Sequence, residues 1–274
     1  MQKIGLLYHP RIAESLRLAT ELQDLLKSRG LSPWLGSAWE NEEARPHVAD
    51  LDLIVTFGGD GTILRAARLA ALHGTPILSV NLGRFGFLAE AQPDQVTEVL
   101  ETVLAGDYWL EERIMLHAEL KRASRLESAY EALNDVVVGH RTISRAIRLA
   151  AYLDGEHLAD YVADGLIVAT ATGSTAYSLA AGGPVLHPLL RDVLLTPIAP
   201  HRALDRSLVL PAESSIEIRL SAEYPAVLTI DGQIEKQMEN GDRVGVSVSP
   251  RTCKLVRTQS TTYFGRDLLE RLKQ

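Results

Sequence analysis

The strongest constraint on the fold lies in residues 52–62, which read DLIVTFGGDGT. A short apolar run here stops at three glycines that enclose one aspartate, Asp60, as is typical of a buried strand that enters a tight turn. A run rich in alanine and leucine follows directly and ends at His73-Gly74. We therefore expect a helix immediately after the turn, with Thr62 as its capping residue.

This strand, turn and helix start together form a candidate site for an anionic ligand. Gly59 and Gly61 lack Cβ atoms, so the backbone can approach a phosphate or a ribose closely, and a helix N-terminus favours negative charge. The Asp60 carboxylate would repel a phosphate unless a metal ion or a reacting hydroxyl lay between them, which suggests a general base or a Mg²⁺ partner. An aspartate that only hydrogen-bonds its own turn is the alternative. The three glycines at a strand-to-helix junction favour the functional role.

The two halves of the chain show different periodicities. Strand patterns at 4–8, 53–57 and 75–80 alternate with helix patterns, which predicts a Rossmann-like parallel sheet in an α/β domain over residues 1–100. Beyond that point the segments are short and rich in Val, Ile, Leu and Tyr, which predicts a mostly-β domain over residues 101–257.

Turn and helix signals refine this division. Asp154-Gly155 is expected to form a hairpin turn in the β-rich half. An amphipathic pattern at 264–273 predicts a C-terminal helix. In open parallel sheets, ligands bind at the carboxyl ends of the strands, which is where Asp60 falls.

Composition and charge exclude several classes of protein. The chain has 274 residues and a net charge of −7, so it lacks the basic surplus on which nonspecific binding to nucleic acids or anionic membranes depends. Cys253 is the only cysteine, which rules out an intrachain disulfide, and we expect it to be buried. There is no signal-peptide pattern and no apolar run long enough to span a bilayer, so we expect a cytoplasmic protein.

A second constellation of polar residues lies in the β-rich half. The segment LNDVVV sets Asn134 and Asp135 at the start of an apolar strand, and an amide with a carboxylate suits a base edge and a ribose diol. An ordinary strand opening is the alternative. Residues 163–184 run from a strand through a hydroxyl-rich turn into a short helix, which is another candidate nucleotide site. A hydroxyl-rich helix cap would explain the Ser and Thr residues there, but not Asp164 and Tyr177 in this order.

Two further features leave alternatives open. The segment HRTISRAIR contains Arg145 among three arginines, which could contact a phosphate or form a solvated basic loop. His201 has no nucleophile or metal-binding cluster beside it in the sequence, which favours a structural role.

The motifs resemble those of a known family. FGGDGT resembles the signature that NAD kinases share with diacylglycerol and sphingosine-type lipid kinases. NLGRFGFL at 81–88 resembles a second NAD kinase motif that the lipid kinases do not normally show, and LND, GSTAY and DGQ follow in the family's order. In the family the LND position is usually Asn-Glu, whereas here it is Asn134-Asp135. The resemblance covers nearly the whole chain and implies a C-terminal helix, within 258–274, that returns to the first domain.

The resemblance also implies an activity and a set of site residues. The protein would phosphorylate the 2′-hydroxyl of the adenosine ribose of NAD to give NADP, using Mg²⁺ with ATP or polyphosphate. Asp60 would accept the hydroxyl proton, Asp164 would contact the nicotinamide side, and the GSTAY segment would line the adenosine pocket. The residues expected to bind the two substrates are Gly59, Gly61, Asn134, Asp135, Arg145, Asp164, Thr175, Ala176, Tyr177, Ser178, Leu179, Ala180, Ala199 and Gln233.

Two other functions remain open from the sequence. A lipid kinase would share the Asp60 motif, but the GSTAY segment and the absence of a membrane-docking face count against it. A nucleotide-binding regulator without activity could use the same pockets, although Asp60 is retained. The expected partners are therefore NAD(H) and ATP or polyphosphate, with no nucleic acid and no membrane, and the family resemblance implies a homodimer or homotetramer.

Overall fold

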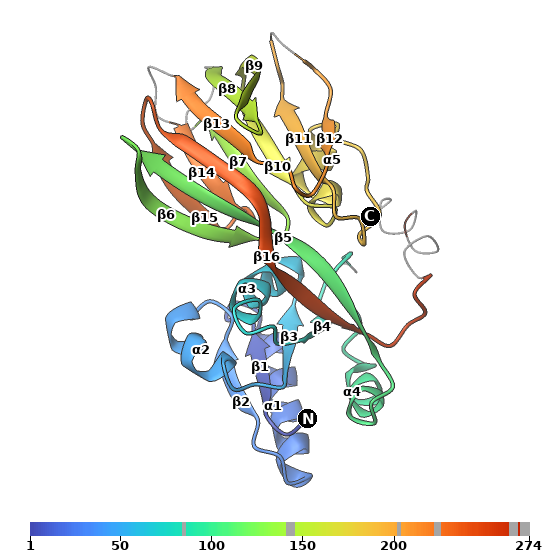
Figure 1. The fold of residues 1–274 in the computed structure, drawn as a ribbon. Coiled ribbons are helices and arrows are strands. Elements are labelled where there is room, and N and C mark those ends of the chain that lie inside the picture. The colour runs from blue at the N-terminus through green and yellow to red at the C-terminus, as the bar shows by residue number, and fades with distance from the viewer. Residues whose placement is uncertain (84–85, 141–145, 202–203, 222–225, 263–267, 269–274) are drawn as a thin grey trace. The chain divides into compact units, whose positions relative to one another are not determined.

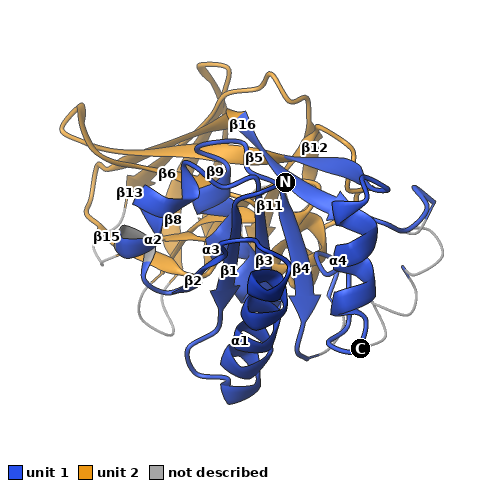
Figure 2. Ribbon diagram, turned by 90° about the horizontal axis from the view of Figure 1, so that it is seen from below, with its two compact units in different colours: residues 1–113, 251–274 blue, residues 114–250 orange. Residues whose placement is uncertain are grey.

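A computed structural model describes residues 1–274 except 84–85, 141–145, 202–203, 222–225, 263–267 and 269–274; the side chains of residues 41 and 42 are also not described. The chain forms two compact units (Figures 1 and 2). Unit 1 contains residues 1–113 and 251–274, and unit 2 contains residues 114–250. Two long strands, β5 (Trp109–Arg122) and β16 (Arg243–Arg257), run from one unit into the other.

Unit 1 is a parallel sheet with helices. Its strands lie in the order β2-β1-β3-β4, and the end of β16 adds to β4 in parallel at Leu255 and Ile77. The elements are β1 (Ile4–Tyr8), α1 (Ala13–Ser28), β2 (Trp34–Ser37), α2 (Asn41–Val48), β3 (Leu53–Gly58), α3 (Asp60–Ala70), β4 (Ile77–Asn81) and α4 (Val96–Leu104).

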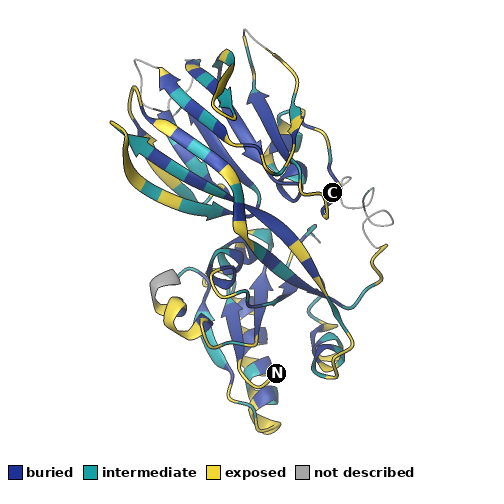
Figure 3. Cartoon of the chain, viewed as in Figure 1, coloured by how far each residue is buried: buried dark blue, intermediate teal, exposed yellow. Residues whose placement is uncertain are grey.

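Burial explains why β3 is continuously apolar. Every residue of β3 is buried, because it lies between β1 and β4 in the middle of the parallel sheet (Figure 3). Val55 and Phe57 pack in one core cluster with residues of α1, which presents Leu22 and Leu26 to the sheet. The central strand is therefore packed along its whole length, and the turn that carries Asp60 follows it directly.

The strands described in unit 2 form antiparallel pairs, and one short helical segment lies beside them. One sheet has the order β12-β11-β10-β7-β14-β15, and the strands β16, β13, β8 and β9 lie in that order in the other, where β5 pairs with β16 and β6. Its other elements are β6 (Arg125–Ala132), β7 (Asp135–His140), β8 (Ile147–Leu153), β9 (Glu156–Ala163), β10 (Gly165–Ala169), η1 (Gly173–Thr175), α5 (Tyr177–Ala180), β11 (Val193–Ile198), β12 (Leu208–Leu210), β13 (Ile216–Ser221), β14 (Ala226–Ile230) and β15 (Ile234–Met238).

The core of unit 2 is made by alternate residues of both sheets. Val136 and Val138 of β7 pack in the same cluster as Leu149 of β8 and Ile218 of β13. The period-2 pattern of these strands reflects one face in this core. The hairpin expected at Asp154-Gly155 is confirmed, since it joins β8 to β9 with both residues at positive φ, 51° and 87°.

The expected division into an α/β half and a mostly-β half is confirmed, but the returning element is different. The element that comes back from unit 2 to the first sheet is strand β16, not a helix. The helix expected at 264–273 lies almost entirely outside the described residues. The unit boundaries fall at 113/114 and 250/251, inside β5 and β16, whereas the sequence suggested 100/101 and 257/258. A long strand that serves both units has no turn signal in its sequence, so the boundary cannot be seen there.

None of the described helices is long and apolar enough to cross a bilayer. Cys253 is buried on β16, as expected.

Candidate functional site

The turn after β3 places Asp60 at the first position of a helix. Gly59 is the N-cap, and the backbone N–H groups of Thr62 and Ile63 donate to its carbonyl at 2.9 and 3.4 Å. The expectation that Thr62 caps the helix is therefore wrong, because the capping residue lies three positions earlier. The Thr62 side chain instead packs against Gly58, where an added Cβ would lie 2.8 Å from the Thr62 Cβ.

The backbone conformation and packing at Gly59 do not require a glycine. Its φ of −92° is accessible to any residue, and an added Cβ would meet nothing within 4 Å. A side chain at this position would project into open space directly before the helix N-terminus. The glycine therefore leaves room beside the first N–H groups of α3, where an anion is favoured.

The loop after β4 comes back to touch Asp60. Strands β3 and β4 are parallel neighbours with Gly58 opposite Asn81, so the loops that follow them leave from the same edge of the sheet. A Cβ added at Gly86 would lie 2.6 Å from the Asp60 carboxyl carbon and closer still to both carboxylate oxygens. Only glycine allows this carboxylate to occupy its position. The sequence had singled out Gly86 only as part of a loop motif, and its contact with Asp60 is visible only in the structure.

A cationic group lies one turn along the same helix. Arg65 is four residues from Gly61, which places both on one face of α3. Its guanidinium lies 4.3 Å from the Trp39 ring centroid, and that ring lies 4.1 Å from the His9 ring. Burial and the neighbouring charges of Arg68 and Arg11 lower the pKa of Arg65, and its Nε has no hydrogen-bond partner among the described residues. This positive region suits a polyanionic ligand.

In unit 2, Asp231 organises the segment that contains Asn134 and Asp135. Its carboxylate accepts the backbone N–H groups of Leu133, Asn134 and Asp135 at 3.1, 2.8 and 3.2 Å. Asp231 itself has a positive φ of 51° in the turn between β14 and β15. The sequence had marked Asp231 only as part of the DGQ turn, so its role as an anchor was missed.

Asp135 is a buried acid beside this anchor. It is 4% exposed, and burial together with the Asp231 charge raises its pKa to about 7. At neutral pH it therefore exists in both protonation states. The acid form can donate a hydrogen bond, whereas the ionised form only accepts.

The turn after β10 packs against the same segment. Ala169, the last residue of β10, lies opposite Asp135, and the Thr170 N–H donates to the Asn134 carbonyl at 2.9 Å. A Cβ at Gly173 would lie 2.5 Å from the Asn134 carbonyl carbon. The structure therefore brings Asn134, Asp135 and the GSTAY turn together.

The hydroxyl groups of this turn mostly point into the protein. The Ser174 hydroxyl donates to the Ala171 carbonyl at 2.6 Å, and Ser178 is fully buried with its hydroxyl 3.1 Å from that of Thr196. The Thr175 hydroxyl donates to the Thr172 carbonyl at 3.1 Å. By contrast, Tyr177 and Ala180 are exposed, and Ala176 and Leu179 are half-buried. The structure thus separates this predicted set into inward and outward side chains.

Two other predicted residues lie at the opposite end of β10. Asp164 precedes this strand, and its N–H donates to the Ile198 carbonyl at 2.9 Å, next to Ala199. Its carboxylate lies 3.7 Å from the His140 ring. Ala199 has a φ of 43°, a strained conformation for a residue with a Cβ. A five-residue strand separates this group from the GSTAY turn, which places the two about 15 Å apart.

The remaining predicted residues are Gln233 and Arg145. Gln233 follows Asp231 by two residues, and its N–H donates to the Ile230 carbonyl at 2.9 Å, so it lies in the turn next to Asn134 and Asp135. Arg145 lies outside the described residues. His201 donates its backbone N–H to the Val162 carbonyl at 2.8 Å.

The described residues could help to bind Mg²⁺ only if phosphate groups of a substrate supplied its other ligands. They contain no group of three His, Cys, Asp or Glu side chains that could hold a metal. Mg²⁺ is usually held by one or two carboxylates together with substrate phosphates and water. Asp60, a single carboxylate at a turn suited to phosphate, fits that pattern.

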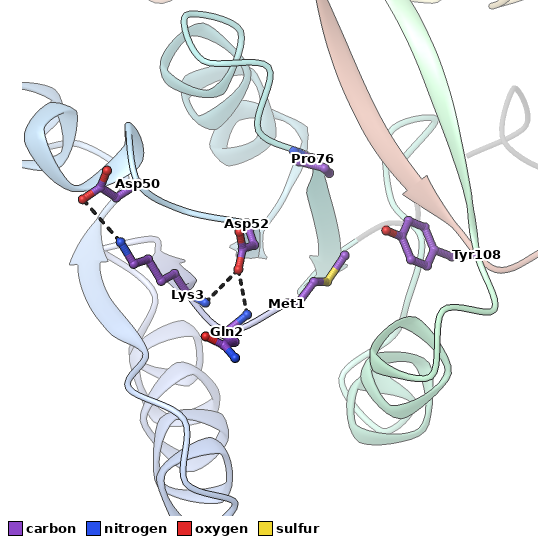
Figure 4. A pocket seen from close by; sticks show the side chains of 7 residues that line it. All are labelled: Met1, Gln2, Lys3, Asp50, Asp52, Pro76 and Tyr108. Atoms are coloured by element: carbon purple, nitrogen blue, oxygen red, sulfur yellow. Dashed lines mark hydrogen bonds and ion pairs between the residues drawn. The ribbon is translucent and has the colours of Figure 1, made fainter.

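A shallow depression of about 610 Å³ lies elsewhere in unit 1 (Figure 4). It is lined by residues at the amino ends of the parallel strands, including Lys3, Asp52 and Pro76. The Asp52 carboxylate accepts the Gln2 and Lys3 N–H groups at 2.7 and 3.0 Å. Asp60 follows the carboxyl end of β3, so this depression does not contain the candidate catalytic residue.

Comparisons with known proteins cover both halves of the chain. Residues 4–108 match the ATP-NAD kinase N-terminal domain and residues 133–258 match the ATP-NAD kinase C-terminal domain. An NAD kinase from Dehalococcoides mccartyi is 41% identical over 273 residues, which cover 99% of this chain and 96% of that protein.

Solved structures show the same similarity. Yeast NADH kinase complexed with NADH has a TM-score of 0.84 and 26% identity, covering 100% of this chain and 88% of that one. An NAD kinase from Archaeoglobus fulgidus in complex with ATP has a TM-score of 0.77 and 27% identity, covering 99% of this chain and 98% of that one. The chain therefore belongs to the NAD kinase family.

Proposed function

We propose that this NAD kinase family member transfers the γ-phosphoryl group of ATP to the 2′-hydroxyl of the adenosine ribose of NAD, and that Asp60 receives the hydroxyl proton. The observation that carries the proposal is the Asp60 carboxylate, which lies at the first position of α3 and against Gly86. The relatives named NAD kinase, and the solved relatives complexed with NADH and with ATP, support the choice of substrates.

The chemistry follows from the charges at the turn. As the 2′-oxygen forms a bond to the γ-phosphorus, its proton passes to Asp60, the bond to the β,γ-bridging oxygen breaks, and ADP leaves. Negative charge on the transferred group is stabilised by the helix N-terminus beside Gly59 and Gly61. Arg65 and its neighbours attract the phosphate chain of the donor. Mg²⁺, when bound with ATP, would neutralise part of the phosphate charge, and Asp60 is the described carboxylate that could contact it.

The two groups in unit 2 suit the two ends of a dinucleotide. We place the adenosine at Asn134, Asp135 and the outward residues of the GSTAY turn, and the nicotinamide side at Asp164 and Ala199. The separation of about 15 Å along β10 supports this assignment, because two nucleosides joined by a pyrophosphate can bridge it. The Asp231 anchor supports it further, since it presents Asn134 and Asp135 in a defined geometry.

Two finer points remain part of the proposal. Polyphosphate is an alternative donor, because the cationic region near Arg65 recognises phosphate rather than a base. Unit 2 carries exposed apolar side chains, namely Val209 on the edge strand β12 and Leu189, Leu190 and Leu204 outside the strands, which support a homodimer or homotetramer. Sedimentation of the purified protein measures that state directly.

The central test is NADP formation by the purified protein from NAD and Mg²⁺, with ATP and polyphosphate in parallel reactions. Asp60→Asn keeps the size of the side chain and removes the base, so we expect turnover to fall by about 100- to 10,000-fold with NAD binding retained. Near-normal turnover in Asp60→Asn would remove Asp60 from this role. NAD binding without any turnover by the unaltered protein would favour a regulator, and phosphorylation of diacylglycerol instead would indicate a lipid kinase.

A further inference from the structure

A buried ionic cluster lies in unit 1 and is not accounted for by substrate binding. Arg257, at the last position of β16, and Arg113, on β5, are each 1% exposed, and Glu111 and Glu90 are 1% and 4% exposed. Arg257 Nε donates to Glu111 Oε2 at 2.7 Å, and Arg113 lies 3.0 Å from the same oxygen. Burial opposes the charge of Glu111, but the guanidinium groups of Arg257 and Arg113 hold its pKa below the usual value. The cluster is therefore ionic despite its burial.

Arg257 uses its other nitrogen atoms on the loop after β4. Nη1 donates to the Ala89 carbonyl at 2.9 Å and reaches the Leu88 carbonyl at 3.4 Å, while Nη2 reaches the Phe87 carbonyl at 3.5 Å. Nη1 also lies 3.1 Å from Glu90 Oε2. One guanidinium thus contacts three consecutive carbonyls at residues 87–89, which lie outside the described helices and strands.

Two other contacts fix the same loop from neighbouring elements. The Ser79 hydroxyl of β4 donates to the Leu88 carbonyl at 2.7 Å. Glu90 Oε1 accepts the backbone N–H of Thr258 at 2.7 Å and the Thr258 hydroxyl at 2.8 Å, directly after Arg257. The loop is therefore held on one side by β4 and on the other by the end of β16.

Gly86 is the residue immediately before the carbonyls that Arg257 holds. It is also the residue whose Cα lies against the Asp60 carboxylate, with no room for a Cβ. Movement of the loop by a fraction of an ångström would either press on that carboxylate or leave it unsupported. Misplacement of a catalytic group by about 1 Å can reduce a rate by about 100-fold.

We propose that Arg257 is a positioning residue for phosphoryl transfer: by holding the carbonyls of residues 87–89, it sets Gly86 against Asp60 and fixes the carboxylate in its working orientation. This inference rests on the proposed role of Asp60. Arginine suits the task because its planar guanidinium presents five donors in fixed directions, whereas lysine presents a compact ammonium on a flexible stem. A lysine would keep the charge opposite Glu90 and Glu111 but could not contact the same set of carbonyls at once.

The test compares Arg257→Lys, Arg257→Met and a control, Arg122→Met. Arg122 is also ion-paired, with Asp242 and Glu239, but it belongs to unit 2, whereas the loop and Asp60 belong to unit 1. For Arg257→Lys, we expect kcat to fall by about 10- to 100-fold while the KM values for NAD and ATP stay within about twofold. Arg122→Met should keep the kcat of the unaltered protein.

Amide hydrogen exchange gives a second readout that does not depend on turnover. In Arg257→Lys, residues 86–90 should exchange faster than in the unaltered protein, while α1 should exchange at the same rate. If Arg257→Met fails to fold, Arg257→Lys still decides the matter. Unchanged kcat together with unchanged loop exchange in folded Arg257→Lys would overturn the inference. A fall in kcat without faster loop exchange would also overturn it, because the effect would not pass through the loop. Failure of the unaltered protein to form NADP would instead overturn the proposed function.

Discussion

The chain contains two turns that look alike in sequence and differ in structure. Each follows a buried strand, contains glycine and leads into a helix: the turn after β3 in unit 1 and the turn after β10 in unit 2. The first leads directly into an eleven-residue helix, whereas the second passes through a single 3₁₀ turn into a four-residue helix.

The two turns differ in how their polar groups are used, and most of those in the second turn bond within the protein. In unit 1, Gly59 faces open space and Asp60 is half-buried as a residue. In unit 2, Gly173 packs on the Asn134 backbone, and the Ser174 and Ser178 hydroxyls bond within the protein. The first turn therefore leaves backbone groups and a carboxylate available to a ligand. The second uses its hydroxyl groups to hold its own shape, and it presents only a few outward side chains.

The largest expected effect on kcat comes from Gly86→Ala, which changes a residue that packs against the first turn. The added Cβ would lie 2.6 Å from the Asp60 carboxyl carbon, so the carboxylate must leave its position. We expect kcat to fall by about 1,000-fold, since a displaced general base loses most of its contribution. Steady-state kinetics with NAD and ATP measure this directly.

Gly83→Ala is the matched control on the same loop, because a Cβ there would meet nothing within 4 Å. Its kcat should stay within about twofold of the unaltered protein. Equal activity of the two alanine variants would mean that the packing of Gly86 on Asp60 has no part in catalysis.

Asp135, which lies next to the second turn, should make the stability of the protein depend on pH. Its pKa of about 7 in the folded protein lies above the ordinary value of about 3.9 in the unfolded chain, so the folded state binds the proton more tightly. Its stabilisation is fully present below about pH 4 and is lost as the pH rises through about 7. The free energy of unfolding should therefore fall by roughly 3–4 kcal/mol over this range because of this residue.

Asp135→Asn should remove that part of the pH dependence, as measured by chemical denaturation at a series of pH values. Asp94→Asn, at an exposed position, supplies the control for the loss of a carboxylate. If the free energy of unfolding of Asp135→Asn fell between pH 4 and 7 as steeply as that of the unaltered protein, Asp135 would be ionised throughout this range.

A pair of glycine variants separates the two turns most sharply. Gly173→Ala places a Cβ 2.5 Å from the Asn134 carbonyl carbon and 2.8 Å from its Cα, and backbone atoms cannot yield as a flexible side chain would. We expect it to lower the free energy of unfolding by about 2 kcal/mol.

Gly59→Ala has open space for its Cβ, so the free energy of unfolding should change by no more than about 0.5 kcal/mol. Its effect should appear as a higher KM for ATP, because the methyl group occupies the space left for the phosphate. If Gly59→Ala were the less stable of the two proteins, the assignment of one glycine to the ligand and the other to the fold would be wrong.

The smallest effect is expected from Ser178→Ala. The Ser178 hydroxyl bonds only within the protein in the described structure, 3.1 Å from that of Thr196. Its loss should cost about 1 kcal/mol of stability and leave the KM for NAD unchanged. Tyr177→Ala, at an exposed neighbouring position, should raise that KM instead. A raised KM in Ser178→Ala would place its hydroxyl on the ligand.

Much of the site could be predicted because its signals are local. The glycines around Asp60, the apolar strand before them and the helix pattern after them all lie within about twenty residues, and strand ends in a parallel sheet have a known relation to ligands. The Asp154-Gly155 hairpin was equally readable, since both residues adopt the positive φ that such turns require. The N-cap of α3 was misplaced by three residues, at Thr62 instead of Gly59, because Asp60 and Thr62 are both plausible near a helix N-terminus.

The sequence by itself determined that one half of the chain is α/β and the other mostly β. It also determined the strand, turn and helix around Asp60 and the chemistry of Asn134-Asp135, because periodicity and turn residues act over short distances. Only the tertiary structure decided which partners these residues meet. Asp60 contacts Gly86, and the backbone of Asn134 and Asp135 is hydrogen-bonded to Asp231. The loop after β4 is hydrogen-bonded to Arg257. The partners in these contacts are separated by 26 to 170 positions in the sequence. Such contacts arise when the sheets assemble and buried polar groups must find acceptors, and no local pattern records which distant group will supply them.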